Sequence, residues 1–303
     1  MNRMWPVPEE LAHTRIDAAL AEISGMSRVT VVALIAEGRV QLNGRAIAKS
    51  AKVEFGDVID IDLPDPDMRE SEPTIELPIV FQDADIVVIN KPAGIAAHPS
   101  QGWSGPTVTG SLQSMGIVLT AYGPTERKGI VHRLDVGTSG LMVLTKSDHA
   151  YVNIKDQFRN RTVSKIYHTL VQGRLDPSSG TIDAPIDRHP TSSYRFAVMQ
   201  SGRKSITHYD TLDAFAYSSL LEIHLETGRT HQIRVHMSAL RHPCCGDLTY
   251  GADPKLAAKM GLERQWLHAV RLEFEHPGTQ QRVEFTSEYA PELARALERA
   301  SQL

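Results

Sequence analysis

Residues 129–146, GIVHRLDVGTSGLMVLTK, join a compact polar segment to an apolar run. His132, Arg133 and Asp135 fall within four positions, and residues 141–144 are all apolar. A short apolar run bounded by glycine and lysine is typical of a fully buried strand. A carboxylate and two potential cations beside such a strand are costly to desolvate, so a folded chain keeps them there only with partners or with a function. Asp135 is therefore the best candidate for a working carboxylate, and the alternative is that the three side chains only fasten a loop.

Four further stretches accompany HRLDVGTSG, and in this order the five resemble the motifs of the RluA family of pseudouridine synthases. Together they span about residues 78–290. The resemblance implies the α/β (α+β) fold class, with a catalytic domain built on a mixed, largely antiparallel sheet. The four stretches are NKPAGIAAHPS (90–100), KIYHTLVQG (165–173), LETGRTHQIRVHMSALRHPCCGD (225–247) and LHAVRLEFEHP (267–277).

The same resemblance implies which residues are catalytic. Asp135 stands at the position of the family's catalytic aspartate, Tyr167 lies in its tyrosine-bearing strand, and Arg234 lies in its arginine-bearing motif. From the residues alone, Tyr167 is also compatible with a tyrosine of the core. Arg234 borders the apolar face of an expected helix and needs an anionic partner, which the resemblance names as Asp135. Arg229 is the rival for this role, or a phosphate contact.

Several further residues are expected to contact the substrate. The resemblance implies that Arg133 occupies the space that a flipped uridine vacates, and that the loop carrying Lys91 lies beside the substrate. The alternative for Lys91 is a solvated surface charge. The full set of expected substrate contacts is Arg133, His132, Thr138, Lys91, Arg229 and Lys165.

The composition is that of an ordinary globular protein. The chain has 303 residues, of which 41% are hydrophobic and 22% charged, and this length allows one large domain and a small one. No apolar run approaches the roughly 18 residues of a membrane span, and the N-terminal residues lack the apolar centre of a signal peptide. We therefore expect a cytoplasmic protein without a membrane partner, and we expect it to be a monomer.

Neither the cysteines nor the histidines indicate a metal site. Cys244 and Cys245 are adjacent, which suits neither a disulfide framework nor spaced zinc ligands, so we expect both to be reduced. His231, His236 and His242 are five and six residues apart and do not share a helical face. The reaction that the resemblance implies uses neither a metal nor an organic cofactor, and we expect none.

The charge is distributed unevenly along the chain. The net charge of −4 argues against a nucleic-acid partner. However, residues 14–52 carry six basic and three acidic side chains, whereas residues 62–72 carry five acidic side chains and one basic. Phosphate contacts depend on such local patches rather than on the total charge. The sequence therefore predicts a basic module followed by an acidic tether.

Periodicity predicts two short helices and a small sheet in the basic module. The first ten residues show no periodicity, and we expect a loose arm there. Thr14 is placed to cap the first helix and Ser27 to cap the second. The Asn-Gly pair at 43–44 is the strongest short-range signal for a hairpin, and residues 58–63 alternate as a strand.

The stretch from TRIDAAL to DVIDID resembles the RNA-binding domain first seen in ribosomal protein S4, a frequent companion of this enzyme family. The resemblance divides the chain into an S4-like α/β RNA-binding domain at 14–63, an acidic linker at 64–74 and a catalytic domain at 75–303. Three arginines at the helix termini could meet phosphates together with exposed backbone amides. The alternative is that each is a solvated surface charge. These expected RNA contacts are Arg15, Arg28 and Arg39.

Local patterns also predict elements of the catalytic domain. Residues 86–89 and 221–227 are expected strands, and residues 90–94 are expected to leave the sheet as a loop. Asp148 and Thr230 are each placed to cap a helix.

The function that the resemblance implies is the isomerisation of specific uridines to pseudouridine in structured RNA, with large-subunit (23S) ribosomal RNA preferred. The target base must leave the helical stack, at a cost on the order of a few kcal/mol. Transfer RNA is an alternative substrate, because the same motifs serve both. A non-catalytic RNA-binding ribosome-assembly protein is a second class of function, against which Asp135, Tyr167 and Arg234 together argue. A carboxylate glycosidase is a third class, and it would need a second essential acid that the five stretches do not offer.

Overall fold

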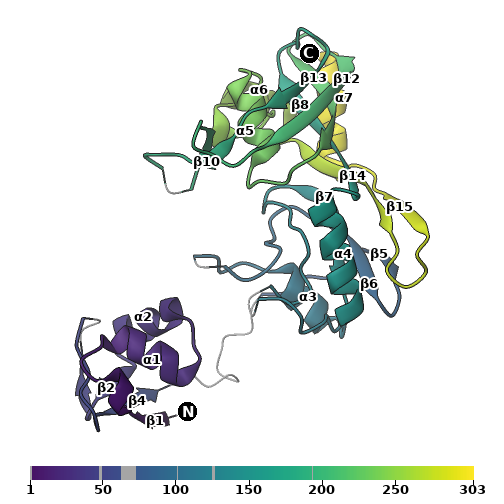
Figure 1. Ribbon diagram of the computed structural model, residues 1–303. Helices are drawn as coiled ribbons and strands as arrows, with labels where there is room; N and C mark the ends of the chain where they lie inside the picture. The colour runs from purple at the N-terminus through teal and green to yellow at the C-terminus, as the bar shows by residue number, and fades with distance from the viewer. Residues whose placement is uncertain (1, 48–49, 63–72, 101, 125–126, 193) are drawn as a thin grey trace. The chain divides into compact units, whose positions relative to one another are not determined.

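The chain folds into two compact units, residues 1–71 and 72–303, each with its own hydrophobic core. The computed structural model describes residues 2–47, 50–62, 73–100, 102–124, 127–192 and 194–303 (Figure 1). The expected acidic linker, residues 64–74, lies outside the described residues up to position 72.

The first unit is a four-stranded antiparallel sheet packed against two helices. The helices bury Ile16, Leu20 and Val31 against Ile59 and Ile61 of the sheet, and all five side chains are inaccessible to solvent. The strand order is β1-β4-β2-β3. The elements in chain order are β1 (Asn2–Pro6), the 3-10 turn Glu9–Leu11, α1 (Ile16–Ser24), α2 (Arg28–Ala36), β2 (Val40–Leu42), β3 (Arg45–Ala46) and β4 (Val58–Asp62).

Two expectations for this unit are wrong. The N-terminal residues are not a loose arm, because residues 2–6 pair antiparallel with β4 and Trp5 packs against the core. An edge strand with free backbone groups accepts such an additional strand whatever the periodicity of its sequence. Thr14 does not cap α1, since its hydroxyl donates a hydrogen bond to the carbonyl of Leu11 at 2.6 Å and Arg15 occupies the N-cap.

Two other expectations for this unit are confirmed. Ser27 caps α2, and its side chain accepts a hydrogen bond from the backbone N–H of Thr30 at 3.2 Å. Asn43 and Gly44 form the turn between β2 and β3 with φ values of 51° and 74°. Positive φ at both central positions is what a two-residue hairpin requires.

The second unit is built on a nine-stranded sheet in the order β5-β6-β7-β14-β8-β13-β12-β9, with β15 paired to β14. Among the described pairs of this sheet, β7 and β14 are parallel and all others are antiparallel. The expected mixed, largely antiparallel sheet is confirmed. Its strands are β5 (Ile79–Gln82), β6 (Ile86–Lys91), β7 (Ser139–Thr145), β8 (Ser164–Gln172), β9 (Ser179–Asp183), β12 (Ile206–Ala214), β13 (Ser218–Leu225), β14 (Leu267–Glu275) and β15 (Arg282–Thr286).

Alternation along β6 sends neighbouring side chains into two different cores. Ile86 and Val88 pack with α4 (Asp148–Asn160), whereas Val87 and Ile89 pack with α3 (Val108–Ser114) on the opposite face (Figure 1). The four positions from Ile86 to Ile89 are all apolar because both faces of the strand are covered there. The remaining elements are α5 (Gln232–Ala239), the 3-10 turn Leu248–Tyr250, α6 (Pro254–Met260), α7 (Pro291–Gln302) and the small hairpin of β10 (Ile186–Arg188) and β11 (Phe196–Val198).

Two helix caps of this unit lie one residue from their predicted positions. Ser147 caps α4 by accepting from the N–H of Ala150 at 3.2 Å, and Asp148 is the first helical residue. Thr230 does not cap α5, because His231 occupies the N-cap in the left-handed conformation with φ of 58°.

The close approach of β7 and β14 positions the segment that carries Asp135. Gly140 has φ of 114°, and a Cβ at this position would lie 2.4 Å from the carbonyl oxygen of Ala269. Only glycine therefore permits the parallel pairing. Since β8 is the next strand after β14 and Tyr167 pairs with Ala269, the start of β7 and the middle of β8 lie close together in the sheet.

Candidate active site

The three expected catalytic residues line one pocket of about 90 Å³. Asp135 comes from the loop before β7, Tyr167 from β8 and Arg234 from α5. Three of the expected substrate contacts line the same pocket. They are Arg133, Thr138 and Arg229.

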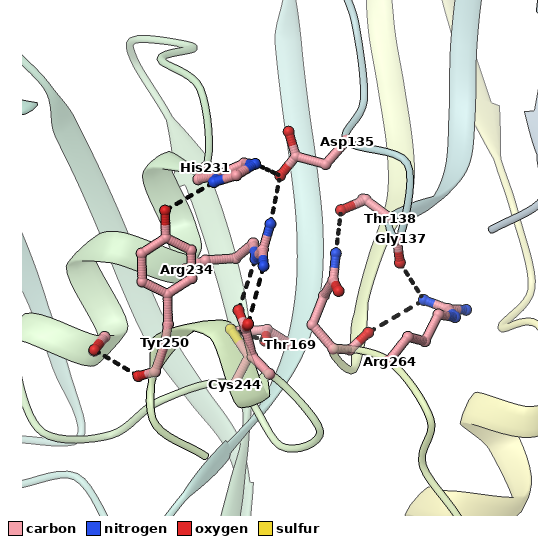
Figure 2. A network of polar contacts seen from close by, with 12 residues as sticks. Asp135, Gly137, Thr138, Thr169, His231, Arg234, Cys244, Tyr250 and Arg264 are labelled. Carbon is pink, nitrogen blue, oxygen red and sulfur yellow. Dashed lines mark hydrogen bonds and ion pairs between the residues drawn. The ribbon is translucent and has the colours of Figure 1, made fainter. Parts of the chain in front are cut away.

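The guanidinium of Arg234 contacts two carboxylates, and it lies closer to one than to the other. Its Nε and Nη2 donate to the two carboxylate oxygens of Asp247 at 2.6 and 2.9 Å, whereas Nη1 lies 3.5 Å from Oδ2 of Asp135 (Figure 2). Arg234 is only 7% exposed. Burial lowers its pKa, but Asp247 and then Asp135 outweigh burial, so the pKa is raised and the guanidinium stays charged. The expected Asp135 partner is thus present, but Asp247 is the stronger one.

His231 faces Asp135 from the other side. Its Nε2 lies 3.9 Å from Oδ2 of Asp135, and its Nδ1 lies 2.8 Å from the hydroxyl of Tyr250 (Figure 2). The Tyr250 hydroxyl already accepts a hydrogen bond from the N–H of Phe196 at 3.0 Å. We therefore assign the hydroxyl as the donor to Nδ1 of His231, which leaves the imidazole proton on Nε2. Burial lowers the pKa of His231, although Asp135 opposes the shift. The neutral imidazole therefore presents Nε2–H to the carboxylate.

Tyr167 forms a buried wall of the pocket. It is 8% exposed. Burial, followed by the charge of Asp135, raises the pKa of its phenol. The phenol therefore remains protonated near neutral pH, which favours stacking against a base over removal of a proton.

The loop that carries Asp135 is held in place by the side chain of Arg264, which precedes β14 in the chain. Nη1 of Arg264 donates to the carbonyl of Gly137 at 3.0 Å (Figure 2). Its Nη2 donates to the hydroxyl of Ser139 at 2.9 Å. Glu292 of α7 holds the same guanidinium at 2.6 Å. The loop therefore presents Asp135 from a fixed backbone.

Lys91 corrects an expectation. It is the last residue of β6, whereas we expected residues 90–94 to form a loop beside the substrate, and its side chain is fully buried. Its ammonium donates to the carbonyls of Pro92 and Ile95 at 2.8 and 3.0 Å and approaches that of Val136 at 3.4 Å. Burial lowers its pKa to about 7, although Asp135 opposes the shift. Lys91 thus supports the loop next to Asp135 and does not line the pocket.

This arrangement of carboxylate, arginine and tyrosine occurs in a segment that matches a known family. Residues 85–239 match the RNA pseudouridylate synthase family. The chain belongs to this family. It is an RNA pseudouridine synthase, an isomerase, and the resemblance to the RluA family is borne out at this level.

Relatives and a solved structure agree with the family. An uncharacterized RNA pseudouridine synthase of Mycobacterium bovis is 54% identical over 98% of this chain and 97% of its own length. Ribosomal large subunit pseudouridine synthase D of Nitrosomonas europaea is 39% identical over 96% of this chain and 86% of its own. The structure titled human RNA pseudouridylate synthase domain containing 4 covers 74% of this chain and 92% of its own, with a TM-score of 0.58 and 25% identity.

A second pocket of the synthase, of about 370 Å³, adjoins the first. Arg133 and Arg229 line both pockets, and His132 and Lys165 line the second. His132 accepts a hydrogen bond at Nε2 from the backbone of β7 at 3.0 Å and stacks on Phe158. Burial, with the charge of Lys165, lowers the pKa of His132 to about 3, so this ring is neutral.

The expected RNA contacts of the first unit all have carboxylate partners. Arg15 and Arg28 each contact Asp17 at 3.0 Å, and Asp17 is 3% exposed. Arg39 contacts Glu37 at 3.2 Å. The guanidinium groups remain partly exposed, but part of their charge is neutralised within the unit.

The sequence did not predict four residues of the candidate site. Asp247 closes one of the five matched stretches, and an acid there was a usable signal. His231 was weighed only as a metal ligand. Tyr250 and Arg264 lie outside the matched stretches.

Among the described residues, no cluster of His, Cys, Asp or Glu is arranged to hold a metal. Cys244 and Cys245 form no disulfide, as expected. No described helix has the length and apolar character to cross a membrane.

Proposed function

We propose that this synthase converts uridines of large-subunit ribosomal RNA to pseudouridine, with Asp135 as the catalytic carboxylate. The observation that carries the proposal is a carboxylate on a pocket wall, 3.5 Å from a buried guanidinium that Asp247 already holds. The preference for large-subunit RNA rests on relatives such as the Nitrosomonas europaea protein, whose name states that substrate.

The reaction rearranges bonds within one nucleotide. The bond between N1 and C1′ breaks, the base turns over, C5 bonds to C1′, C5 loses its proton and N1 gains one. Asp135 supplies the carboxylate that attacks, or that stabilises charge developing at the sugar. Arg234 holds Asp135 ionised by charge and hydrogen bonding. Tyr167 stacks on the uracil, and its protonated phenol suits that role.

The target base reaches the pocket by leaving the RNA stack. Arg133 is exposed at the mouth that the two pockets share. Its side chain occupies the space that the base vacates, which offsets part of the unstacking cost of roughly a few kcal/mol. Thr138 and Arg229 complete the pocket around the flipped nucleotide.

The first unit is proposed to be an S4-like RNA-binding domain at 14–63, joined by the acidic linker 64–74 to the catalytic domain at 75–303. Two short helices followed by a small hairpin sheet support this proposal. Arg15, Arg28 and Arg39 are its RNA contacts. Because each is paired with a carboxylate, the domain orients the RNA more than it adds affinity.

The test is to incubate the purified protein with unmodified transcripts of large-subunit ribosomal RNA and of transfer RNAs, and to map pseudouridine chemically. We expect signal at discrete large-subunit positions, and no signal with Asp135→Asn. Signal confined to transfer RNA would move the substrate to the alternative. Absence of signal on every transcript, with RNA binding intact, would favour the ribosome-assembly protein.

A further inference from the structure

The pocket that adjoins the uridine pocket has an excess of positive charge. Five of its lining residues are basic and one is acidic, although the whole chain carries a net charge of −4. We propose that this pocket binds the phosphodiester group next to the target uridine, which places the flanking RNA backbone on β8 and on the end of α4. This inference rests on the proposed function. The basic residues are Arg133, Arg159, Arg161, Lys165 and Arg229, and the acidic one is Glu226.

Lys165 is the cation of this pocket that most needs an external partner. It is only partly exposed, and within the part of the chain that the structure describes no carboxylate lies at ion-pair distance from its ammonium. Its ammonium lies 5.7 Å from the ring centroid of Phe158, a contact that supplies no counter-charge. A half-buried cation without a counter-ion is costly, and an anionic ligand removes that cost.

The two neighbouring arginines, Arg159 and Arg161, already have carboxylate partners, unlike Lys165. Arg161 contacts Glu226 at 3.3 Å, and Arg159 contacts Asp156 at 3.0 Å. These ion pairs hold both guanidinium groups at the rim, while Lys165 stands deeper in the pocket. An anion that entered would therefore meet Lys165 and find the arginines already oriented.

The ligand class follows from the connection between the two pockets. Both are lined by Arg133, Tyr167, Leu225, Gly228 and Arg229. A uridine in the smaller pocket, which contains Asp135, keeps its sugar and phosphate at this common wall. A phosphodiester is the anion that a flipped nucleotide necessarily brings with it.

The first experiment measures RNA binding without turnover. In an Asp135→Asn background, the full chain is titrated with a fluorescein-labelled oligouridylate of about ten nucleotides over a range of salt concentrations. We expect Lys165→Gln to weaken binding about tenfold at low salt and to reduce the slope of log Kd against log salt by about 0.7. Lys165→Arg keeps the charge and should retain both. The matched control is Lys259→Gln, an exposed lysine of α6 that lines neither pocket.

The second experiment locates the phosphate. In the transcript that the synthase modifies, an uncharged methylphosphonate replaces the phosphate on either side of the mapped uridine. One of the two replacements should raise KM in the wild type and have no further effect in Lys165→Gln. Equal effects of the methylphosphonate in both proteins, or an unchanged salt slope in Lys165→Gln, would overturn the proposal. If no uridine is modified but Lys165→Gln still weakens oligouridylate binding, the pocket stands and the proposed function fails.

Discussion

Each unit contains one buried charge that two partners share, but the sign of the buried charge is opposite. In the first unit the buried carboxylate of Asp17 binds two partly exposed guanidinium groups. In the second unit the buried guanidinium of Arg234 binds two carboxylates, those of Asp247 and Asp135. In the first arrangement two guanidinium groups share one carboxylate, so one positive charge remains uncompensated at the surface, where RNA phosphates could bind. The second leaves a carboxylate over in a pocket, where a nucleotide could react.

The difference lies in how strongly each partner is held. Asp247 is 2% exposed and takes two short hydrogen bonds from Arg234, so it is a structural counter-ion. Asp135 receives one contact from Arg234, at 3.5 Å, has His231 at 3.9 Å, and lies on a loop that Arg264 holds. Because Asp247 compensates the buried guanidinium, Asp135 is free to interact with substrate.

The largest effect is expected from Arg234→Met. Removal of the guanidinium leaves Asp247 buried without a counter-ion, so the free energy of unfolding should fall by about 3–5 kcal/mol. Pseudouridine formation should be lost as well. The double variant Arg234→Met with Asp247→Leu should regain most of the stability, measured by urea unfolding, but none of the activity. Recovery of activity in the double variant would show that Asp135 does not need the arginine.

Lys91 is a buried cation that no carboxylate of the described residues contacts, and its effect should appear as a pH dependence of stability. Its folded pKa of about 7 lies below its ordinary value of 10.5, so between these values the unfolded chain binds a proton that the folded chain releases. The free energy of unfolding of the wild type should therefore rise from pH 7 to pH 10 relative to Lys91→Met, by up to about 4 kcal/mol. Parallel pH profiles of the two proteins would contradict a buried, weakly basic Lys91.

Tyr250→Phe tests whether the hydrogen bond from Tyr250 to His231 orients the imidazole toward Asp135. The variant removes the hydroxyl that fixes the proton of His231 on Nε2, so we expect kcat to fall about tenfold with little change in KM, or roughly 1.4 kcal/mol. Tyr289→Phe is the matched control, because it also removes a tyrosine hydroxyl that lies 2.5 Å from a histidine, His168, but neither residue lines the two pockets described above. Equal losses in both variants would indicate a general structural effect.

The smallest effect is expected from Asp17→Asn. The hydrogen bond from Arg15 lowers the pKa of Asp17, so its contribution to stability is present above its unfolded pKa and is lost as the pH falls through the lower folded value. The variant should therefore lose less stability than the wild type when acidified below about pH 4. Its kcat on saturating RNA should be unchanged. A loss of RNA binding would contradict the idea that Asp17 only neutralises part of the surface charge.

The resemblance to a known family predicted the mixed sheet and the three residues that meet in the Asp135 pocket, whereas local patterns predicted several helices and individual strands. Asp135, Tyr167 and Arg234 each lie in a stretch that resembles a family motif, whereas local patterning alone left Tyr167 open as a tyrosine of the core. The pairing of Arg234 with Asp247 could not be predicted in this way, because it depends on how the chain turns back after α5. Lys91 was misplaced for a related reason. The segment 90–94 was expected to leave the sheet as a loop beside the substrate, and only the three-dimensional structure shows the carbonyls that bind the buried ammonium.

The most direct test compares the two carboxylates on either side of Arg234. Single-turnover rates of pseudouridine formation are measured at saturating enzyme, on the transcript that the wild type modifies, for Asp135→Asn and for Asp247→Asn. We expect no product with Asp135→Asn. With Asp247→Asn we expect a rate that is reduced on the order of a hundredfold but measurable. Product from Asp135→Asn, together with its loss in Asp247→Asn, would assign the chemistry to the other carboxylate and contradict the account.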